Sequence, residues 1–327
     1  MQLSSEISLN YDFLALGEAV VDIISSDLVS CLSEASQFDR FVGGQVTNLA
    51  MNMARLGNRA ALGTCVGDDG FGKLIQEQVY EAGVNSTHIQ MTTEAPTTLI
   101  SITQTSSGTP DFIVYRGADD QLMAVQDLLQ AAAQSKILHT SAFGLSRDPA
   151  RTTIIQAMQI ARENGNRVSI DPNYHPKIWP DVPRFLDILQ EVFQFVNITK
   201  PSLDDCARIF GSGLEPIDYA KRFLEWGAEL VVITMGDQGV YLAEEDGDHY
   251  QVFSNKVSAV DVTGAGDAFW SGLLTALLDG QSALDAVRFG QIIAEIKIGR
   301  VGPLSIFPDR QEIYAKAKMV RTKSLHS

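Results

Sequence analysis

Short apolar runs rich in Val, Ile and Leu alternate with segments of helical apolar spacing along most of this 327-residue chain. Such alternation favours a parallel sheet covered by helices on both faces. Strands are predicted at residues 12–17, 59–66, 136–139, 167–171, 195–199 and 230–234. Helices are predicted at 46–56, 71–82, 149–164, 202–210, 217–226, 265–278 and 282–298. The predicted fold class is therefore α/β, with a doubly wound, mainly parallel sheet.

Residues 20–25, 97–103 and 111–115 break this pattern, because they alternate at period two. A turn cluster at 106–110 separates the last two stretches. We expect antiparallel hairpin strands that form a small separate sheet covering an active site. The alternative is an edge extension of the main sheet. Because no linker divides the chain, we expect a single domain over 1–327, with a β lid built from about 18–42 and 95–117.

Composition and charge exclude several classes of protein. Forty Asp plus Glu against 25 Lys plus Arg give a net charge of −15, which disfavours nucleic acid and anionic lipid as partners. No stretch reaches the ~20 apolar residues of a membrane span, and the N-terminus does not resemble a secretion signal. We expect a cytoplasmic protein with no nucleic-acid or membrane partner.

The most informative segment is the turn Gly264-Ala265-Gly266-Asp267, which opens an apolar helix. Small residues at a helix start leave backbone N–H groups and the positive end of the helix dipole free to receive an anion. Asp267 would accept the proton of an alcohol that attacks a phosphorus held by those N–H groups. The alternative for Asp267 alone is an ordinary acidic residue in the first turn of a helix.

A second glycine-rich turn, Gly43-Gly44, opens the helix that contains Asn48. Adjacent glycines let a polyhydroxylated ligand approach the backbone, and Asn48 offers both a donor and an acceptor for vicinal hydroxyls. The alternatives are a simple turn and an early helix residue that acts as a cap.

These two segments resemble the two signatures of the PfkB-type carbohydrate kinases, the ribokinase family. Three further segments also resemble family motifs in the same order: Gly17-Glu18…Asp22, residues 67–72 and residues 233–239. The resemblance implies a ribokinase-like fold with a small β-sheet lid, which often mediates a homodimer. It also implies transfer of the ATP γ-phosphoryl group to a sugar hydroxyl.

The resemblance also assigns roles to individual residues. Asp267 would be the catalytic base, and the anion hole would comprise Gly264, Ala265 and Gly266. The sugar would be held by Asp22, Gly43, Gly44 and Asn48, with Arg116 and Asn173 as further substrate contacts. The nucleotide would be bound by Lys200, Ser202, Thr234, Gly236, Gly239 and Gln291.

Metal ions follow from the same resemblance. Mg²⁺ would arrive with ATP, and Asp205 would hold it through water, because Ser202-Leu203-Asp204-Asp205 stands where the family usually has Asn-x-x-Glu. The loop with Asp261 and Thr263 corresponds to the monovalent-cation site of many members, which would take K⁺. Glu295 stands at a position where this helix is usually apolar in the family, and nothing in the sequence accounts for it.

The substrate class is indicated by residues 170–179, which are similar to the Asp-Pro-Asn-x-Arg run of fructokinases and 2-keto-3-deoxygluconate kinases. His175 replaces the arginine, and an imidazole cannot reproduce a bidentate guanidinium clamp on a carboxylate. A neutral sugar is favoured, hence a fructokinase-like hexose kinase. The alternatives are a 2-keto-3-deoxygluconate kinase, a ribokinase, a nucleoside kinase, or a catalytically silent sugar- or nucleotide-binding protein. For Arg116 the alternative is a solvated surface side chain.

Other common nucleotide and hydrolase motifs are excluded. Residues 67–73 have the glycine spacing of a P-loop, but Leu74 stands where Ser or Thr should ligate magnesium. No Gly-x-Gly-x-x-Gly opens a helix after a strand, the five histidines lack metal-ligand spacing, and no Gly-x-Ser-x-Gly occurs.

Overall fold

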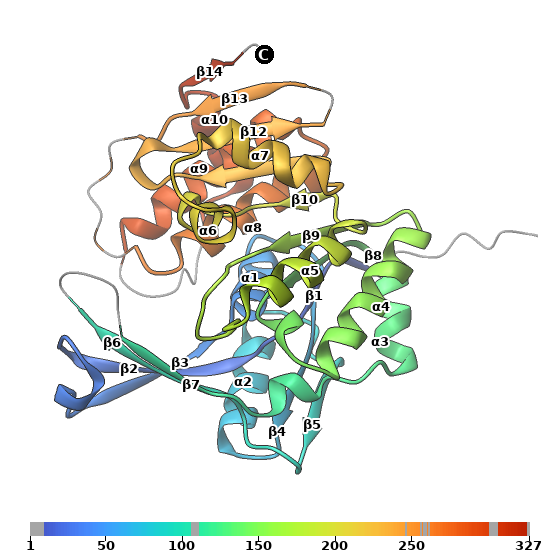
Figure 1. Ribbon diagram of the computed structural model, residues 1–327, viewed down its shortest axis with the longest axis vertical. Coiled ribbons are helices and arrows are strands. Elements are labelled where there is room, and N and C mark those ends of the chain that lie inside the picture. Colours follow the sequence, from blue (N-terminus) through green and yellow to red (C-terminus); the bar gives the residue numbers. More distant parts are fainter. Residues whose placement is uncertain are drawn as a thin grey trace, which may run out of the picture.

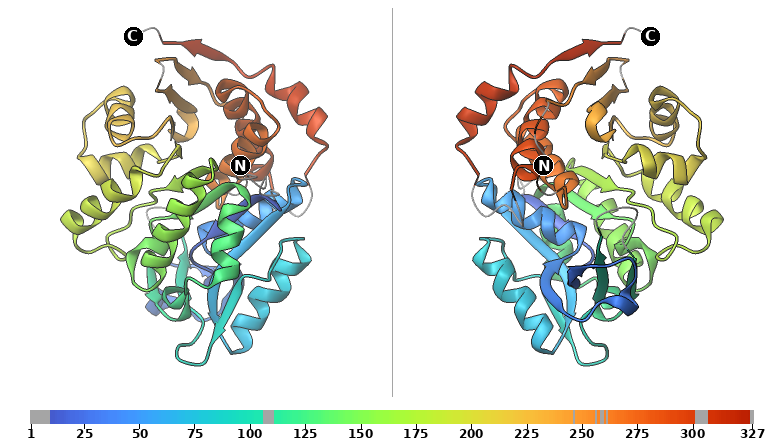
Figure 2. Two further views of the ribbon diagram at one scale, coloured as in Figure 1. Left: turned by 90° about the vertical axis from the view of Figure 1, so that its right-hand side faces the viewer. Right: turned by 90° about the vertical axis from the view of Figure 1, so that its left-hand side faces the viewer.

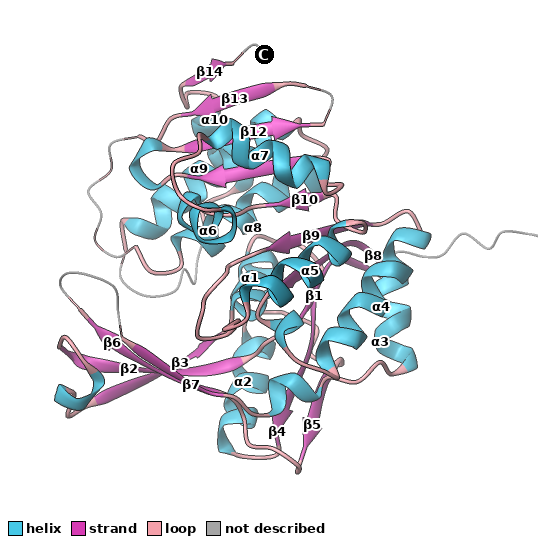
Figure 3. Ribbon diagram, in the orientation of Figure 1, coloured by secondary structure: helices cyan, strands magenta, loops and turns pink. Residues whose placement is uncertain are grey.

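In a computed structural model, the chain forms a large and a small β-sheet, with helices on both faces of the large one (Figures 1 and 3). The structure describes residues 10–105, 111–245, 247–255, 257, 260, 262–300 and 307–325. Within these residues the large sheet has ten strands, in the order β14-β13-β12-β11-β10-β9-β8-β1-β4-β5. The bounds are β1 (Tyr11–Leu16), β4 (Ala60–Gly67), β5 (Ile89–Thr92), β8 (Ser135–Ser141), β9 (Arg167–Asp171), β10 (Ile198–Thr199), β11 (Leu230–Thr234), β12 (Val240–Glu244), β13 (His249–Val252) and β14 (Thr322–Ser324).

The strands from β5 to β11 in this order run parallel, and β12, β13 and β14 add antiparallel strands at one edge. β1 shows why the central strands are apolar throughout. Phe13 and Ala15 face one buried cluster, whereas Leu14 and Leu16 face the other. A strand covered on both faces has no polar side to present to water.

Two layers of helices supply those clusters, and Figure 2 shows them on either side of the sheet. One layer comprises α1 (Gln45–Arg55), α2 (Gly70–Glu81), α8 (Ala265–Leu278), α9 (Ala283–Ile298) and α10 (Arg310–Ala317). The other comprises α3 (Gln126–Ala133), α4 (Ala150–Glu163), α5 (Val182–Phe193), α6 (Leu203–Phe210) and α7 (Pro216–Glu225). No helix among the described residues is long and apolar enough to span a membrane.

The elements predicted for the large sheet and its helices agree with the structure to within two residues at each end, with one exception. The strand predicted at 195–199 is reduced to β10, because the amides of Phe195 and Val196 bond back to Val192 and Phe193 as α5 ends. The alternation of apolar runs did not predict β5, the antiparallel strands β12–β14, or helices α3, α5 and α10.

The small sheet is separate from the large one, in the order β3-β2-β6-β7, which excludes the edge-extension alternative. Its strands are β2 (Val20–Leu28), β3 (Phe38–Gly43), β6 (Leu99–Gln104) and β7 (Phe112–Tyr115). Both β2 and β6 belong to antiparallel pairs, as predicted, and they pair with each other in parallel. The unpredicted β3 is the antiparallel partner of β2 and leads the chain back into α1. The turn predicted at 106–110 lies outside the described residues.

The strand register divides the small sheet into two faces. Asp22 lies opposite Phe41 and Ile100, so these side chains share what we call the Asp22 face. Phe38, Ile113 and Tyr115 lie on the opposite, outer face, where they are exposed to 42%, 44% and 55%. Short 3-10 turns lie at Leu32–Glu34, Ala118–Gln121, Gly144–Ser146 and Gly236–Gln238.

Candidate active site

The candidate site lies at the carboxyl ends of the parallel strands. Because these strands run in one direction, the residues that follow them meet at one edge of the sheet, the usual ligand position in such folds. Glu18 follows β1, Asp171 ends β9, and Lys200 follows β10. Helices α1 and α8 start at the same edge, since the side chain of Asn48 in α1 contacts Asp267 in α8.

The start of α8 has the geometry expected of an anion-binding turn. Gly264 caps the helix in the left-handed region at φ 72°, where a glycine is favoured. Ala265 N–H donates to the carbonyl of Val262 at 3.1 Å, so this predicted member of the anion hole is already occupied. Within the described residues, the amides of Gly264, Gly266 and Asp267 have no protein acceptor. They are the donors that remain for a phosphate.

A buried lysine adjoins this turn. Lys200 Nζ lies 3.0 Å from Asp171 Oδ2, and the two side chains are 5% and 6% exposed. A Cβ atom built on Gly266 would lie 3.9 Å from the same ammonium group. Although burial alone would lower the pKa of Lys200, the nearby carboxylates of Asp171, Asp205 and Asp267 raise it. A permanent positive charge therefore stands beside the free amides of α8.

Asp267 lies in the first turn of α8 and is bonded to α1. Asn48 Nδ2 donates to Asp267 Oδ2 at 3.1 Å. Burial and the charge of Asp171 raise the pKa of Asp267 to about 7, against the opposing effects of Asn48 and Lys200. A carboxylate that titrates near neutral pH is matched to accepting a proton from an alcohol.

Asp22 and the paired glycines form the other side of the site. Burial and the charge of Asp267 raise the pKa of Asp22 to about 7. A Cβ on Gly43 would lie 2.1 Å from Asp22 Oδ2, and one on Gly44, at φ 97°, would lie 2.5 Å from the carbonyl oxygen of Glu18. The two glycines are therefore required by Asp22 and Glu18 themselves, and not only by a ligand.

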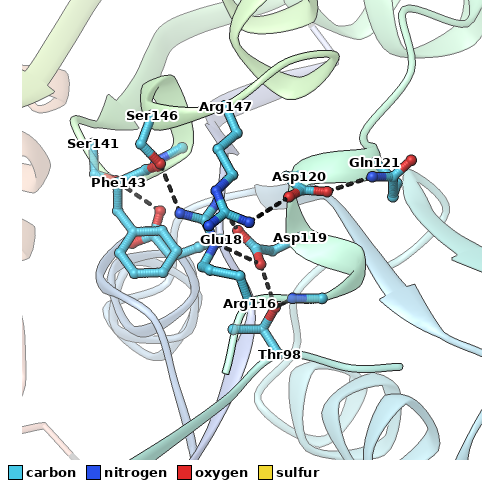
Figure 4. A network of polar contacts seen from close by, with 12 residues as sticks. Glu18, Thr98, Arg116, Asp119, Asp120, Gln121, Ser141, Phe143, Ser146 and Arg147 are labelled. Carbon is cyan, nitrogen blue, oxygen red and sulfur yellow. Dashed lines mark hydrogen bonds and ion pairs between the residues drawn. The ribbon is translucent and has the colours of Figure 1, made fainter. Parts of the chain in front are cut away.

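Glu18 is a carboxylate at the edge of the site to which the sequence pattern assigned no role (Figure 4). Its Oε1 accepts from Gln45 N–H at 2.9 Å, and its Oε2 accepts from Ser141 Oγ at 2.7 Å. Burial raises the pKa of Glu18 to about 7. An acidic residue directly after a buried strand is the signal that could have identified it.

Arg116 follows β7 and is neither a solvated side chain nor an unpaired one. It is 7% exposed, and its Nη2 lies 2.6 Å from Asp119 Oδ2. Its Nη1 donates to Ser146 Oγ at 2.7 Å, and its guanidinium lies 4.3 Å from the ring centre of Phe143. Figure 4 shows this network beside Glu18, between the small sheet and the loop that follows β8.

Residues predicted for the nucleotide surround the ends of β10 and β11. Ser202 bridges Thr234 and forms a capping box with Asp205 at the start of α6. The Ser202 N–H and Oγ both donate to Asp205 Oδ2, at 3.1 and 2.5 Å. The turn after Thr234 contains Gly236 and Gly239, and a Cβ on Gly239 would lie 2.1 Å from the Val252 carbonyl. The close approach of the Val252 carbonyl therefore requires a glycine at position 239, independently of any contact with a nucleotide.

Gln291 and Glu295 together hold the loop that follows β13. Gln291 Nε2 donates to Glu295 Oε1 at 2.9 Å and to Ser254 Oγ at 3.3 Å. Glu295 in turn accepts from the backbone and side-chain N–H of Asn255, at 3.0 and 2.9 Å. This accounts for the acidic residue that the sequence pattern left unexplained.

Two of the remaining predicted residues are exposed to solvent. Asn173 has an exposed side chain two residues after Asp171 and adopts φ 30°, a region that Asn tolerates. Thr263 is exposed, and Asp261 lies outside the described residues. In the described part of the chain, no three His, Cys, Asp or Glu side chains cluster as a metal site.

Comparison with known proteins agrees with this geometry. Residues 12–310 match the model of the pfkB family of carbohydrate kinases. An ATP-dependent 6-phosphofructokinase from Thermoanaerobacterium thermosaccharolyticum is 32% identical over 91% of this chain and 91% of its own. The solved fructokinase of Halothermothrix orenii is 34% identical, with a TM-score of 0.75 over 90% of this chain and 99% of that one. A protein from E. coli solved with ATP and Mg²⁺ shares the fold, at 24% identity and a TM-score of 0.82 over 94% and 99% of the chains.

Proposed function

The chain belongs to the pfkB family of carbohydrate kinases, and from that premise we propose that it transfers the γ-phosphoryl group of ATP to a hydroxyl of a neutral hexose, as fructokinases do. One observation carries the proposal: Asp267, the free amides of α8 and the Lys200 ammonium converge on one turn. A base and a preorganised positive field are the two elements that phosphoryl transfer requires of a protein.

In the proposed reaction, Asp22 and Asn48 bind sugar hydroxyls and bring one of them to Asp267. Asp267 accepts the hydroxyl proton while the sugar oxygen attacks the γ-phosphorus and the bond to the ADP oxygen breaks. The N–H groups of Gly264 and Gly266 stabilise the charge on the transferred oxygens, and Lys200 adds to that field.

Magnesium fits the donors present at this site. Mg²⁺ keeps several waters and needs few protein oxygens, so an extended acidic cluster is not required. The capping-box bonds both fall on Oδ2 of Asp205, so its other carboxylate oxygen, Oδ1, would hold the water shell of the ion. When bound with ATP, the ion would neutralise phosphate charge.

The cations at the sugar end support a neutral substrate. Arg116 is paired with Asp119, and Lys177 lies 3.4 Å from Asp111 Oδ1. Burial and the charges of Arg208 and Lys177 lower the pKa of His175, so its ring is uncharged at pH 7. A carboxylate or phosphate on the sugar would meet cations that already have partners. Because a 6-phosphofructokinase is among the similar proteins, fructose 6-phosphate is the most informative charged sugar to compare with fructose.

A coupled assay of ADP release over a sugar panel tests the function. The panel comprises fructose, fructose 6-phosphate, ribose, 2-keto-3-deoxygluconate, adenosine and inosine, each with and without K⁺. We expect the highest kcat/KM with fructose. A higher value for a charged sugar would overturn the neutral-hexose assignment. Ligand-dependent thermal stabilisation with no ADP from any sugar would indicate a silent binding protein.

Two finer features belong to the same proposal. We infer that Asp261 and Thr263 help to bind K⁺, and the paired assays measure whether K⁺ activates the enzyme. We also infer that the small sheet is a lid and that a second copy of the chain covers its outer face, since Phe38, Ile113 and Tyr115 are exposed there. Sedimentation velocity of Tyr115→Asp against the unmodified chain tests this, with monomer expected for the variant. A dimer of unchanged affinity would exclude this face.

A further inference from the structure

The loop that joins β9 to α5 reaches across to the small sheet and contacts strand β7. The His175 ring lies 4.5 Å from the Phe112 ring, centre to centre, at an angle of 60°. Lys177 Nζ lies 4.5 Å from the centre of the same ring and donates to the Phe112 carbonyl. It also lies 3.4 Å from Asp111 Oδ1. We call these contacts of His175 and Lys177 with Phe112 the clasp.

Phe112 belongs to the Asp22 face of the small sheet. It lies opposite Ile102, which lies beside Ile24, two residues along β2 from Asp22. The clasp therefore contacts the face of the small sheet that carries Asp22, the residue proposed to bind the sugar. Phe112 starts β7, at the end of that strand away from Arg116, so the clasp restrains the sheet at a distance from the points where it joins the main body and limits its rotation about them.

The other end of the loop begins at the phosphate side of the site. Asp171, which ends β9, forms the buried ion pair with Lys200. His175 and Lys177 follow it by four and six residues. The loop thus connects the small sheet to the strand that fixes the Lys200 ammonium beside α8.

The two clasp side chains are organised by each other. Lys177 N–H donates to His175 Nδ1 at 3.1 Å, which fixes the imidazole plane against Phe112. Lys177 then approaches the same aromatic ring with its ammonium group, an attractive arrangement for a cation. This pairing explains why a histidine is suitable where the family resemblance led us to expect an arginine: the residue packs against the small sheet.

We propose that His175 and Lys177 are positioning residues, which hold Phe112 and the Asp22 face in place and thereby set the affinity for the sugar. The inference rests on the proposed kinase function for its kinetic readout. It assigns neither residue a contact with substrate. Its consequence is that loss of the clasp weakens sugar binding while ATP binding and the phosphoryl-transfer step are retained.

Steady-state kinetics of three variants test the proposal. His175→Ala and Phe112→Ala should each raise the KM for sugar by about threefold to tenfold, as expected for loss of one aromatic contact. The KM for ATP and kcat should stay within twofold. His175→Phe keeps an aromatic ring against Phe112 and should restore most of the affinity. Lys221→Ala, an exposed lysine on α7, is the matched control and should change nothing.

A double-mutant cycle separates the clasp from general destabilisation. If His175 and Phe112 act through their mutual contact, the fold increase in the KM for sugar in the double variant should be smaller than the product of the increases in His175→Ala and Phe112→Ala. Independent effects, an unchanged KM for sugar, or an equal loss in kcat would overturn the proposal.

Hydrogen exchange gives a readout that does not depend on activity. His175→Ala should speed amide exchange in β6 and β7 but leave β9 and β10 unchanged. Unchanged exchange in β7 would overturn the clasp even in an active enzyme. If the unmodified chain phosphorylates no sugar but His175→Ala still speeds amide exchange in β6 and β7, the kinase function is refuted and the structural role of the clasp is supported.

Discussion

Replacing Lys200 by methionine separates the structural and the catalytic contributions of the buried ion pair. The change removes the ammonium that lies 3.0 Å from Asp171 Oδ2, in a pair whose side chains are 5% and 6% exposed. Breaking a buried pair on one side leaves an uncompensated charge and costs about 3–5 kcal/mol of unfolding free energy. Urea denaturation followed by circular dichroism measures that loss.

The double variant Lys200→Met, Asp171→Asn removes both charges and should recover most of the lost stability. Activity should not recover with it, because the field beside the α8 amides is still missing. We expect kcat to be lower by about a hundredfold to a thousandfold in both variants, as for loss of one preorganised electrostatic group. Recovery of kcat together with stability in the double variant would refute the role of Lys200 at the phosphate.

Three further predictions concern the carboxylates of the site. Gly43→Ala, whose Cβ would lie 2.1 Å from Asp22 Oδ2, should raise the KM for sugar more than tenfold with the KM for ATP unchanged, and equal changes in both would contradict it. Because the pKa of Asp267 is raised to about 7, kcat/KM should be high above pH 7 and fall below it as the base is protonated; a profile flat to pH 5 would exclude this base. Burial raises the folded-state pKa of Glu18 to about 7 from 4.5, so the folded state binds the extra proton and stability is lost as pH rises between these values. Glu18→Gln should weaken that pH dependence of unfolding, and an unchanged slope in urea titrations would count against it.

The alternation of apolar runs was sufficient to predict the central sheet, because strands buried on both faces leave a composition signal that needs no partner. Helix α8 was predicted with its observed bounds, since a small-residue turn marks its start and a long apolar run follows. The antiparallel strands β12–β14 carry no comparable signal. β12 and β13 each form a hairpin with the preceding strand, with Thr234 opposite Val240 and Ala243 opposite His249, and an alternation of strands with helices does not indicate hairpins. The pairing of β14 with β13 depends on long-range register, which a single sequence does not contain.

The residues of the candidate site also divide into those that the sequence predicts and those that it does not. Asp22, Gly43, Asn48 and Asp267 stand in local motifs, so a family resemblance in the sequence is enough to nominate them. The ion pair of Lys200 with Asp171 spans 29 residues of sequence and exists only because β9 and β10 are neighbours. A sequence motif identifies residues one at a time. It therefore predicted neither the ion pair of Lys200 with Asp171 nor the partners of Arg116.

The rate of phosphoryl transfer by Asp267→Asn tests the central claim most directly. Asparagine keeps the size of the side chain and the contact with Asn48 but cannot accept the proton of a sugar hydroxyl. Turnover should fall by about a hundredfold to ten-thousandfold while the melting temperature and the dissociation constant for the sugar stay close to those of the unmodified chain. Turnover within tenfold of the unmodified chain would remove Asp267 from the mechanism, and with it the reaction proposed for the start of α8.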